Sequence, residues 1–134
     1  MTVAQSFIKW LEEQGVATFG QDLYLRRVPD SKSTPDAIYW IIPSGGFRIG
    51  ENRTGEVIKQ YSFIINYRSV SARDVEEKLF ALEELLNCAN CVTLEGFEVI
   101  EIEVDAYPSD GDIDEEDRET GLLQVNIKTY KQRC

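Results

Sequence analysis

Hydrophobic and polar residues alternate most clearly over residues 56–68, where every second residue from Tyr61 to Tyr67 is aromatic or aliphatic. A period of two places the apolar side chains on one face of a β-strand and the others on the opposite face. The same alternation recurs over residues 97–107 and 122–131. The sequence therefore predicts three strands, each with one face toward a core and one toward water or a partner.

Two segments instead repeat their apolar residues at steps of three and four, which is typical of amphipathic helices. The first begins at Thr2, a capping residue, and ends near Gln14, with Gly15 as a left-handed stop. The second spans residues 72–87, and Ser71 followed by Asp74 resembles a capping box.

Shorter signals supply the remaining elements. Residues 17–28 are expected to form a strand, and residues 37–42 another that ends in a turn at Pro43–Gly46. Residues 92–94 are expected to pair with residues 97–107 as a hairpin, and residues 30–36 to form a surface loop.

The expected order is α-β-β-β-α-β-β-β. It predicts an α+β fold with a mostly antiparallel sheet and two helices packed on one face. Residues 1–134 are expected to form a single domain, with an acidic surface loop at about 108–120.

Charge narrows the choice of partners. The 134 residues include 24 acidic and 14 basic ones, for a net charge of -10. Such a chain repels phosphate and anionic lipid, so neither specific DNA binding nor membrane binding is expected. No secretory leader or membrane-spanning run is evident, and the odd number of cysteines does not suggest a disulfide framework. We therefore expect a protein made in the cytoplasm with reduced thiols.

The composition also argues against an enzyme and against a metal or other cofactor. The sequence has no histidine, which removes the usual general base and the commonest zinc ligand. Cys88 and Cys91 have C-x-x-C spacing, but no second pair follows, so we interpret them as small apolar residues. Pro43–Gly46 lacks the lysine of a phosphate-binding loop and is interpreted as a plain turn. A small enzyme that uses carboxylates or these two cysteines is a minor alternative.

The acidic stretch invites comparison with a calcium-binding loop, but its spacing does not fit. Counted from Asp110, the sixth position is Glu115 instead of glycine, and the twelfth is Gly121 instead of glutamate. A solvated loop is the favoured interpretation. Weak divalent-ion binding and charge matching with a partner are the alternatives.

Several short motifs follow one another in order along nearly the whole chain. They include the helix around Phe7–Leu11, the strand Tyr61–Arg68 that ends in arginine, and the leucines at 82–86. They continue with Val99–Val104, the pair Tyr107-Pro108, and the closing strand Val125–Tyr130. Together these motifs resemble the tail-terminator and minor capsid (head-tail joining) proteins of long-tailed bacteriophages. The sequence departs from the family pattern in its long acidic stretch at 110–119.

The resemblance implies a structural virion protein that forms a ring, commonly a hexamer, on the head-proximal end of the tail tube. Such a ring ends tail polymerisation and offers a surface to the head connector, while DNA passes through without specific binding. The protein would reside in the virion, and in the host cytoplasm during assembly. A row of acids at Glu101, Glu103 and Asp105 is a candidate lining of the lumen.

Candidate contacts with other subunits or the connector are three arginines and seven acids. They are Arg48, Arg53, Arg68, Asp110, Asp112, Asp114, Glu115, Glu116, Asp117 and Glu119. Two alternatives remain for the function. One is a head- or tail-completion protein that is monomeric until it binds the connector, and the other is a non-viral adaptor that offers a strand edge to its partners.

Overall fold

Two helices and five strands make up the part of the chain that the structure describes. This computed structural model describes residues 2–28, 37–51, 56–87, 94, 96–107 and 119–132. In chain order the elements are α1 (Val3–Glu13), β1 (Leu23–Leu25), β2 (Ile38–Glu51), β3 (Glu56–Ser69), α2 (Ala72–Asn87), β4 (Glu98–Tyr107) and β5 (Glu119–Gln132).

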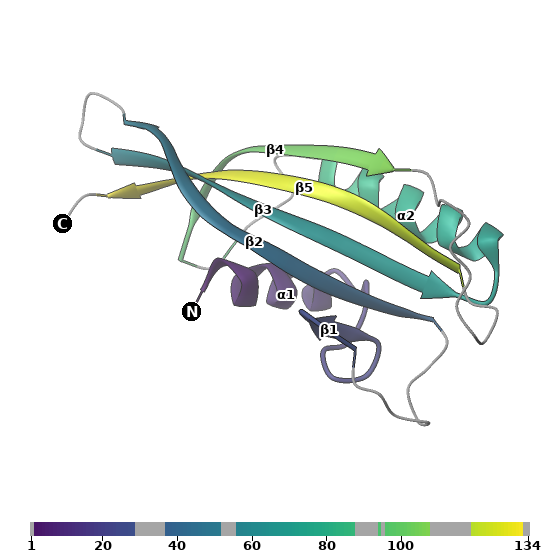
Figure 1. Cartoon of the computed structure of the whole chain (residues 1–134). Coiled ribbons are helices and arrows are strands. Elements are labelled where there is room, and N and C mark those ends of the chain that lie inside the picture. The colour runs from purple at the N-terminus through teal and green to yellow at the C-terminus, as the bar shows by residue number, and fades with distance from the viewer. Residues whose placement is uncertain are drawn as a thin grey trace.

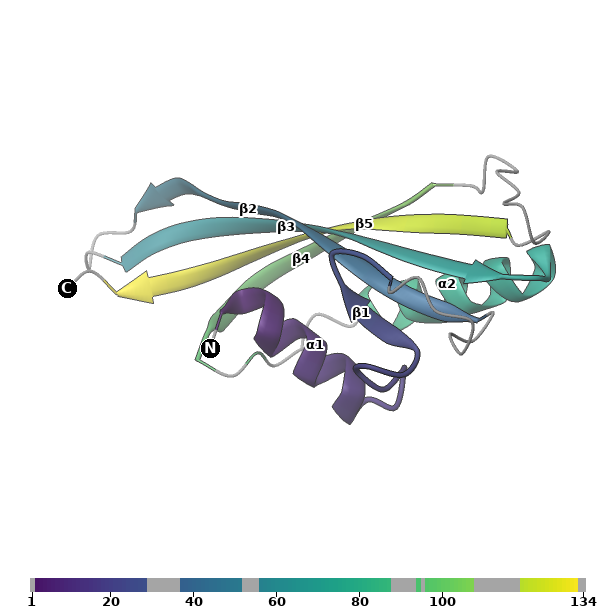
Figure 2. The same ribbon diagram turned by 60° about the horizontal axis from the view of Figure 1, so that its bottom comes forward.

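The strands form one mixed sheet in the order β1-β2-β3-β5-β4. β1 runs parallel to β2, and all other neighbours are antiparallel. Both helices lie on the same face of the sheet (Figure 1; Figure 2). The predicted fold class is thus confirmed: an α+β protein with a mostly antiparallel sheet covered by helices on one side.

The core lies between the helices and the alternate side chains that the sequence pattern placed together. Phe63 and Ile65 of β3 lie beside Leu123 and Val125 of β5, and all four are at most 1% exposed. The helices bury the opposing side chains Phe7, Trp10, Leu11, Val75, Leu82 and Leu86. Burial of such apolar side chains is the main favourable contribution to folding.

Both helices begin as predicted. The Thr2 hydroxyl accepts a hydrogen bond from the Gln5 backbone N–H at 3.2 Å, and the Gln5 side chain accepts one from the Thr2 N–H at 2.8 Å. This reciprocal capping box satisfies two N–H groups that a helix start leaves without internal partners. At the start of α2, the Ser71 hydroxyl accepts from the Asp74 N–H at 3.3 Å. Gly15, with a φ of 75°, follows the end of α1 as expected.

The predicted strand over residues 17–28 was wrong for most of its length, because only Leu23–Leu25 form β1. A turn around Gly20, whose φ is 87°, replaces its first half. The Asp22 carboxylate accepts a hydrogen bond from the Thr18 N–H at 2.6 Å, and this local bond competes with pairing in the sheet. In this turn Ala17 is buried but Phe19 is 50% exposed, so the apolar residues here do not indicate an extended backbone.

The predicted turn at Pro43–Gly46 was also wrong, because β2 continues through it to Glu51. Its glycines accompany a shift of pairing register between Pro43 and Gly46, and a second shift lies between Arg48 and Gly50. Each shift inserts one extra residue into β2, as in a β-bulge, which bends and twists a strand without ending it.

The predicted hairpin at residues 92–107 is reduced to an isolated bridge. Leu94 pairs with Phe97 around Gly96, and β4 then pairs with β5 rather than with a preceding strand. Val92 and Thr93 lie outside the described residues, as does the predicted loop at 30–36.

Gly121 sets how closely α2 approaches β5. A Cβ atom at this position would lie 2.6 Å from Leu79 Cδ1 and 2.7 Å from Val75 Cγ1. Both neighbours are buried in the core, and Val75 has little rotamer freedom in a helix. The glycine therefore allows side chains of α2 to rest directly on the strand backbone.

Gly121→Ala is expected to lower the free energy of unfolding by about 1–3 kcal/mol, because an added methyl group overpacks this contact. Denaturant unfolding of the variant measures the loss. A Leu79→Ala background removes one of the two clashes and leaves the one with Val75 Cγ1, so the cost of Gly121→Ala should shrink without vanishing. An equal cost in both backgrounds would show that the contact with Leu79 is not the cause.

Candidate interaction surfaces

No described helix covers the second face of the sheet (Figure 2). Charged, polar and apolar side chains are mixed on this face. Trp40, Ile64 and Leu122 are half-buried there, and Ile42 is 38% exposed. Ser62 donates a hydrogen bond to the Asn126 side chain at 2.6 Å. A surface that is both apolar and polar suits contact with another protein better than an entirely charged face would.

The acidic row on β4 is exposed on this open face, as the alternation predicted. Lys128 of β5 reaches across to it, with Nζ 3.1 Å from Glu101 and 3.7 Å from Glu103. The hydrogen bond and the charge of Glu101, followed by the charge of Glu103, raise the pKa of Lys128. Lys128 compensates one of the three carboxylate charges of the row, so the row keeps a net negative charge.

β4 is an edge strand of the sheet, with a bulge at Ile100, which is 39% exposed. Bulges and charged side chains are the usual means of keeping an edge strand from pairing indiscriminately. The predicted alternation of Ile100, Ile102 and Val104 is correct only for Ile102 and Val104, which pack against the core. The bulge turns Ile100 away because it shifts the strand by one residue.

The three candidate contact residues that the structure describes lie at opposite ends of the long sheet. Arg48 pairs in register with Lys59, whereas Arg68 pairs with Thr120, and Glu119 with Ser69. Arg68 lies nine positions after Lys59 in β3, which is about 30 Å at the usual rise of a strand. Both views show β2, β3 and β5 continuing past the N-terminus of α1 toward the Arg48 end (Figure 1; Figure 2).

The remaining candidate residues lie outside the described residues. These are Arg53, Asp110, Asp112, Asp114, Glu115, Glu116 and Asp117, together with the cysteines Cys88 and Cys91. Glu119, at the start of β5, and Arg68, at the end of β3, are both half-buried and lie on neighbouring strands.

A buried tyrosine pair fastens the start of α2 to the Arg68 end of the sheet. The Tyr39 and Tyr67 rings pack with their centroids 4.4 Å apart. The Tyr67 hydroxyl donates a hydrogen bond to Asp74 at 2.5 Å, and this bond is the main reason that the pKa of Asp74 is lowered. Burial raises the pKa of Tyr39 to about 12, with smaller contributions from Asp74 and Asp22. Burial and the Asp74 hydrogen bond likewise raise the pKa of Tyr67.

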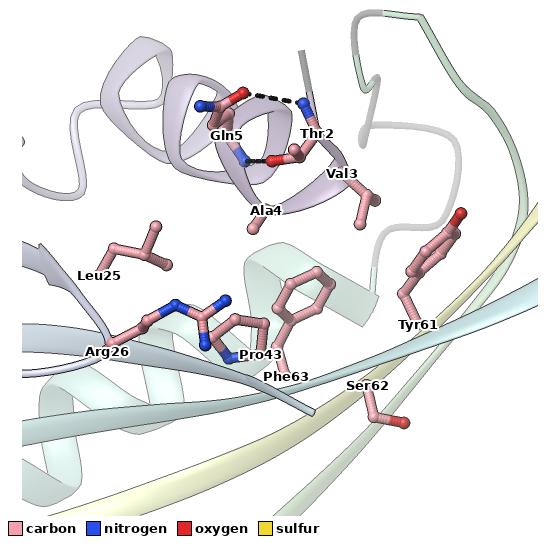
Figure 3. Close-up of a pocket in the computed structure, with 10 residues that line it drawn as sticks. All are labelled: Thr2, Val3, Ala4, Gln5, Leu25, Arg26, Pro43, Tyr61, Ser62 and Phe63. Carbon is pink, nitrogen blue, oxygen red and sulfur yellow. Dashed lines mark hydrogen bonds between the residues drawn. The ribbon is translucent and has the colours of Figure 1, made fainter. Parts of the chain in front are cut away.

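A pocket of about 350 Å³ opens between the N-terminal turn of α1 and the strands beneath it. Figure 3 shows Val3 and Ala4 pointing from the helix toward Phe63, while Leu25 and Arg26 face them from the end of β1. The other lining residues are Thr2, Gln5, Pro43, Tyr61 and Ser62. Thr2 and Gln5 bond to each other in the capping box, and Ser62 to Asn126, so these polar groups already have partners.

Arg26 is the charged residue of this lining, and its backbone is strained. Its φ of 73° lies in the left-handed region, which costs a non-glycine residue roughly 1–2 kcal/mol. Hydrogen bonds hold it there: the Arg26 N–H donates to the Ile41 carbonyl at 2.7 Å, and the Arg27 N–H to that of Leu25 at 2.9 Å. Such strain persists where surrounding structure fixes it and is common at binding sites. Sequence reasoning missed the pocket, because its walls come from four separate elements.

Other kinds of site find no support within the described residues. No group of three or more cysteine, aspartate or glutamate side chains there is arranged to hold a metal ion. In the same part of the chain, no helix is both long and apolar enough to cross a membrane.

Comparison with known proteins gives a likeness in fold. No protein-family model matches the sequence, and no curated protein matches it. Among solved structures, the chain is similar to one from the "Virion of native gene transfer agent (GTA) particle", with a TM-score of 0.60. The match covers 97% of this chain and 98% of that one, at 14% sequence identity. The chain shares its fold with a virion protein. At this identity the likeness concerns the fold alone, from one end of both chains to the other.

Tyr67→Phe is expected to cost about 1 kcal/mol of stability near pH 7, since it leaves Asp74 without its main hydrogen-bond donor. Because the pKa of Asp74 is lower in the folded protein, its hydrogen bond stabilises the fold fully at pH values above the unfolded pKa of about 3.9. This stabilisation is lost as the pH falls through the pKa of Asp74 in the folded protein. The gap between wild type and variant should therefore close on acidification.

Urea unfolding from pH 7 down to pH 2 measures this gap. Tyr24→Phe is the matched control, because the Tyr24 hydroxyl donates to the backbone carbonyl of Gln21 at 2.9 Å. Its effect should not change over the same range. A gap for Tyr67→Phe that stays constant down to pH 2 would contradict the role assigned to Asp74.

Proposed function

We propose that the protein is a structural subunit of a phage or phage-like virion, which closes the head-proximal end of the tail tube as a ring. The full-length fold likeness to a chain of a gene transfer agent virion is the observation that carries this proposal. The ordered motifs of the sequence, which resemble tail-terminator proteins, point in the same direction independently of the fold.

The described candidate contacts, Arg48 near one end of the sheet and Arg68 and Glu119 near the other, support a ring with two different neighbours above and below it. A closed ring requires two distinct contact patches on each subunit. A terminator also meets the tube on one side and the head connector on the other. A sheet with candidate contacts at two ends about 30 Å apart can meet the tube at one end and the connector at the other. Its long strands keep the distance between these two ends constant. We propose the hexamer, the commonest ring of this kind, as the assembled form.

Tail length in a particle-producing strain tests this function directly. Loss of the protein should yield tubes much longer than normal, without attached heads, because nothing stops polymerisation. Electron microscopy measures the length distribution, and expression of the wild-type protein from a plasmid should restore it. Tubes of normal length beside filled, unattached heads would instead identify a completion protein. Unaltered particles would indicate an adaptor unrelated to the virion.

The acidic row of β4 is proposed to face the lumen, where it would repel DNA phosphates and let DNA slide. Glu101→Gln, Glu103→Gln and Asp105→Asn together are expected to leave particle numbers unchanged but slow DNA release. Release kinetics from purified particles measure the effect. Glu13→Gln, on an exposed turn of α1, is a control that should release DNA normally. Unchanged release in the triple variant would place the row outside the lumen.

A further inference from the structure

The α2 helix presents an exposed aromatic ring at the centre of an acidic frame. Phe80 is 64% exposed, more than any other large apolar side chain among the described residues. The residues three and four positions away on either side are all glutamates: Glu76, Glu77, Glu83 and Glu84. Side chains at these spacings are immediate neighbours on a helix surface. We call Phe80 and these four residues the Phe80 knob.

The charges around the knob remain acidic in sum. Arg73 pairs with Glu77 at 3.0 Å, and both side chains are largely exposed. Glu76 and Glu84 are exposed, and Glu83 is half-buried. A scattered exposed apolar residue is ordinary, but an aromatic ring with a charged rim has the composition of an interface anchor. Its complement would be an apolar pocket with a basic residue at its edge.

The pocket beside α1 has this character. Six apolar or aromatic residues line it: Val3, Ala4, Leu25, Pro43, Tyr61 and Phe63. Its volume of about 350 Å³ is ample for a phenyl ring, since an apolar cavity of about 150 Å³ accommodates benzene. Arg26 supplies the positive charge at the lining, and its side chain is exposed. Opposite charges across an interface favour a single orientation of the partners.

The knob and the pocket lie on different parts of the molecule, so that one copy cannot fill its own pocket. α2 packs on β3, β4 and β5, whereas the pocket is formed by α1, the end of β1, β2 and β3. Both views place α2 toward the end of the sheet that is far from the N-terminus of α1 (Figure 1; Figure 2). Two different patches on one chain produce head-to-tail contacts, which close into a ring or continue as a filament.

We propose that the Phe80 ring of one copy inserts into the pocket beside α1 of the next copy, with Arg26 facing the glutamates around Phe80. This contact deepens the proposed function, because it rests on the ring and identifies the surfaces that join neighbouring subunits. The strained backbone at Arg26 then has a role, since it places this residue in the lining of the pocket.

Self-association of the full-length protein over a wide concentration range tests the contact. Phe80→Glu and Arg26→Glu should each raise the dissociation constant at least about tenfold, as expected for a buried aromatic anchor and its charged partner. Ala4→Leu, which fills the pocket without changing charge, should do the same. Val70→Glu and Arg27→Glu are matched controls, because both change exposed side chains outside the two surfaces. Their association should match that of wild type.

Mixing the two disrupted variants gives the sharpest test. The Phe80→Glu variant retains its pocket and the Arg26→Glu variant retains its knob, so an equimolar mixture should form dimers and nothing larger. Sedimentation velocity distinguishes these from monomers and rings. A mixture that remains monomeric, or an Arg26→Glu variant that associates like wild type, would overturn the contact. So would a wild-type chain that stays monomeric at all concentrations and in the presence of tail tubes.

The same variants separate this contact from the proposed function. If the mixture forms dimers while tail length does not depend on the protein, the contact stands and the tail-capping function falls. If tail length depends on the protein while Phe80→Glu still caps tubes normally, the function stands and a different surface joins the subunits.

Discussion

The structure depends on the burial of one face of a long sheet by two helices. Alternate residues of β3 and β5 supply one wall of the core, and Phe7, Trp10 and the apolar side chains of α2 supply the other. Gly121 lets α2 approach β5 directly, and the Tyr67 hydrogen bond to Asp74 fixes the start of the same helix. The two helices cover a single face, so neither of them occupies the opposite face of the sheet in the described part of the chain.

This one-sided arrangement explains why the features of interest lie at the margins of the core. The pocket forms where the first turn of α1 stands over the strands, with Arg26 held at its lining by the hydrogen bond to Ile41. The acidic row lies on the open face of the edge strand β4, and Phe80 points away from the core on α2. A small domain that keeps so many distinct surfaces exposed is suited to assembly with copies of itself and with other proteins.

Sequence periodicity predicted the elements whose two faces differ most. The strand ending at Arg68 and the helix over 72–87 were correct, because alternating and helical patterns report directly on one-sided burial. The pattern failed at Pro43–Gly46, where the glycines mark a bulge in a continuing strand, and at residues 17–22, where Asp22 stabilises a turn. Both failures concern local hydrogen bonds that composition does not reveal. The pocket could not be predicted, because it needs the relative positions of α1, β1, β2 and β3.

The central claim is that this chain works as a ring on the end of a tail tube. Light scattering of the purified full-length protein, across a wide concentration range with and without purified tail tubes, tests it most directly. A mass near six subunits, reached alone or induced by tubes, is the expected result. A protein that stays monomeric and ignores tubes would contradict the claim and favour a completion protein that acts from the head side.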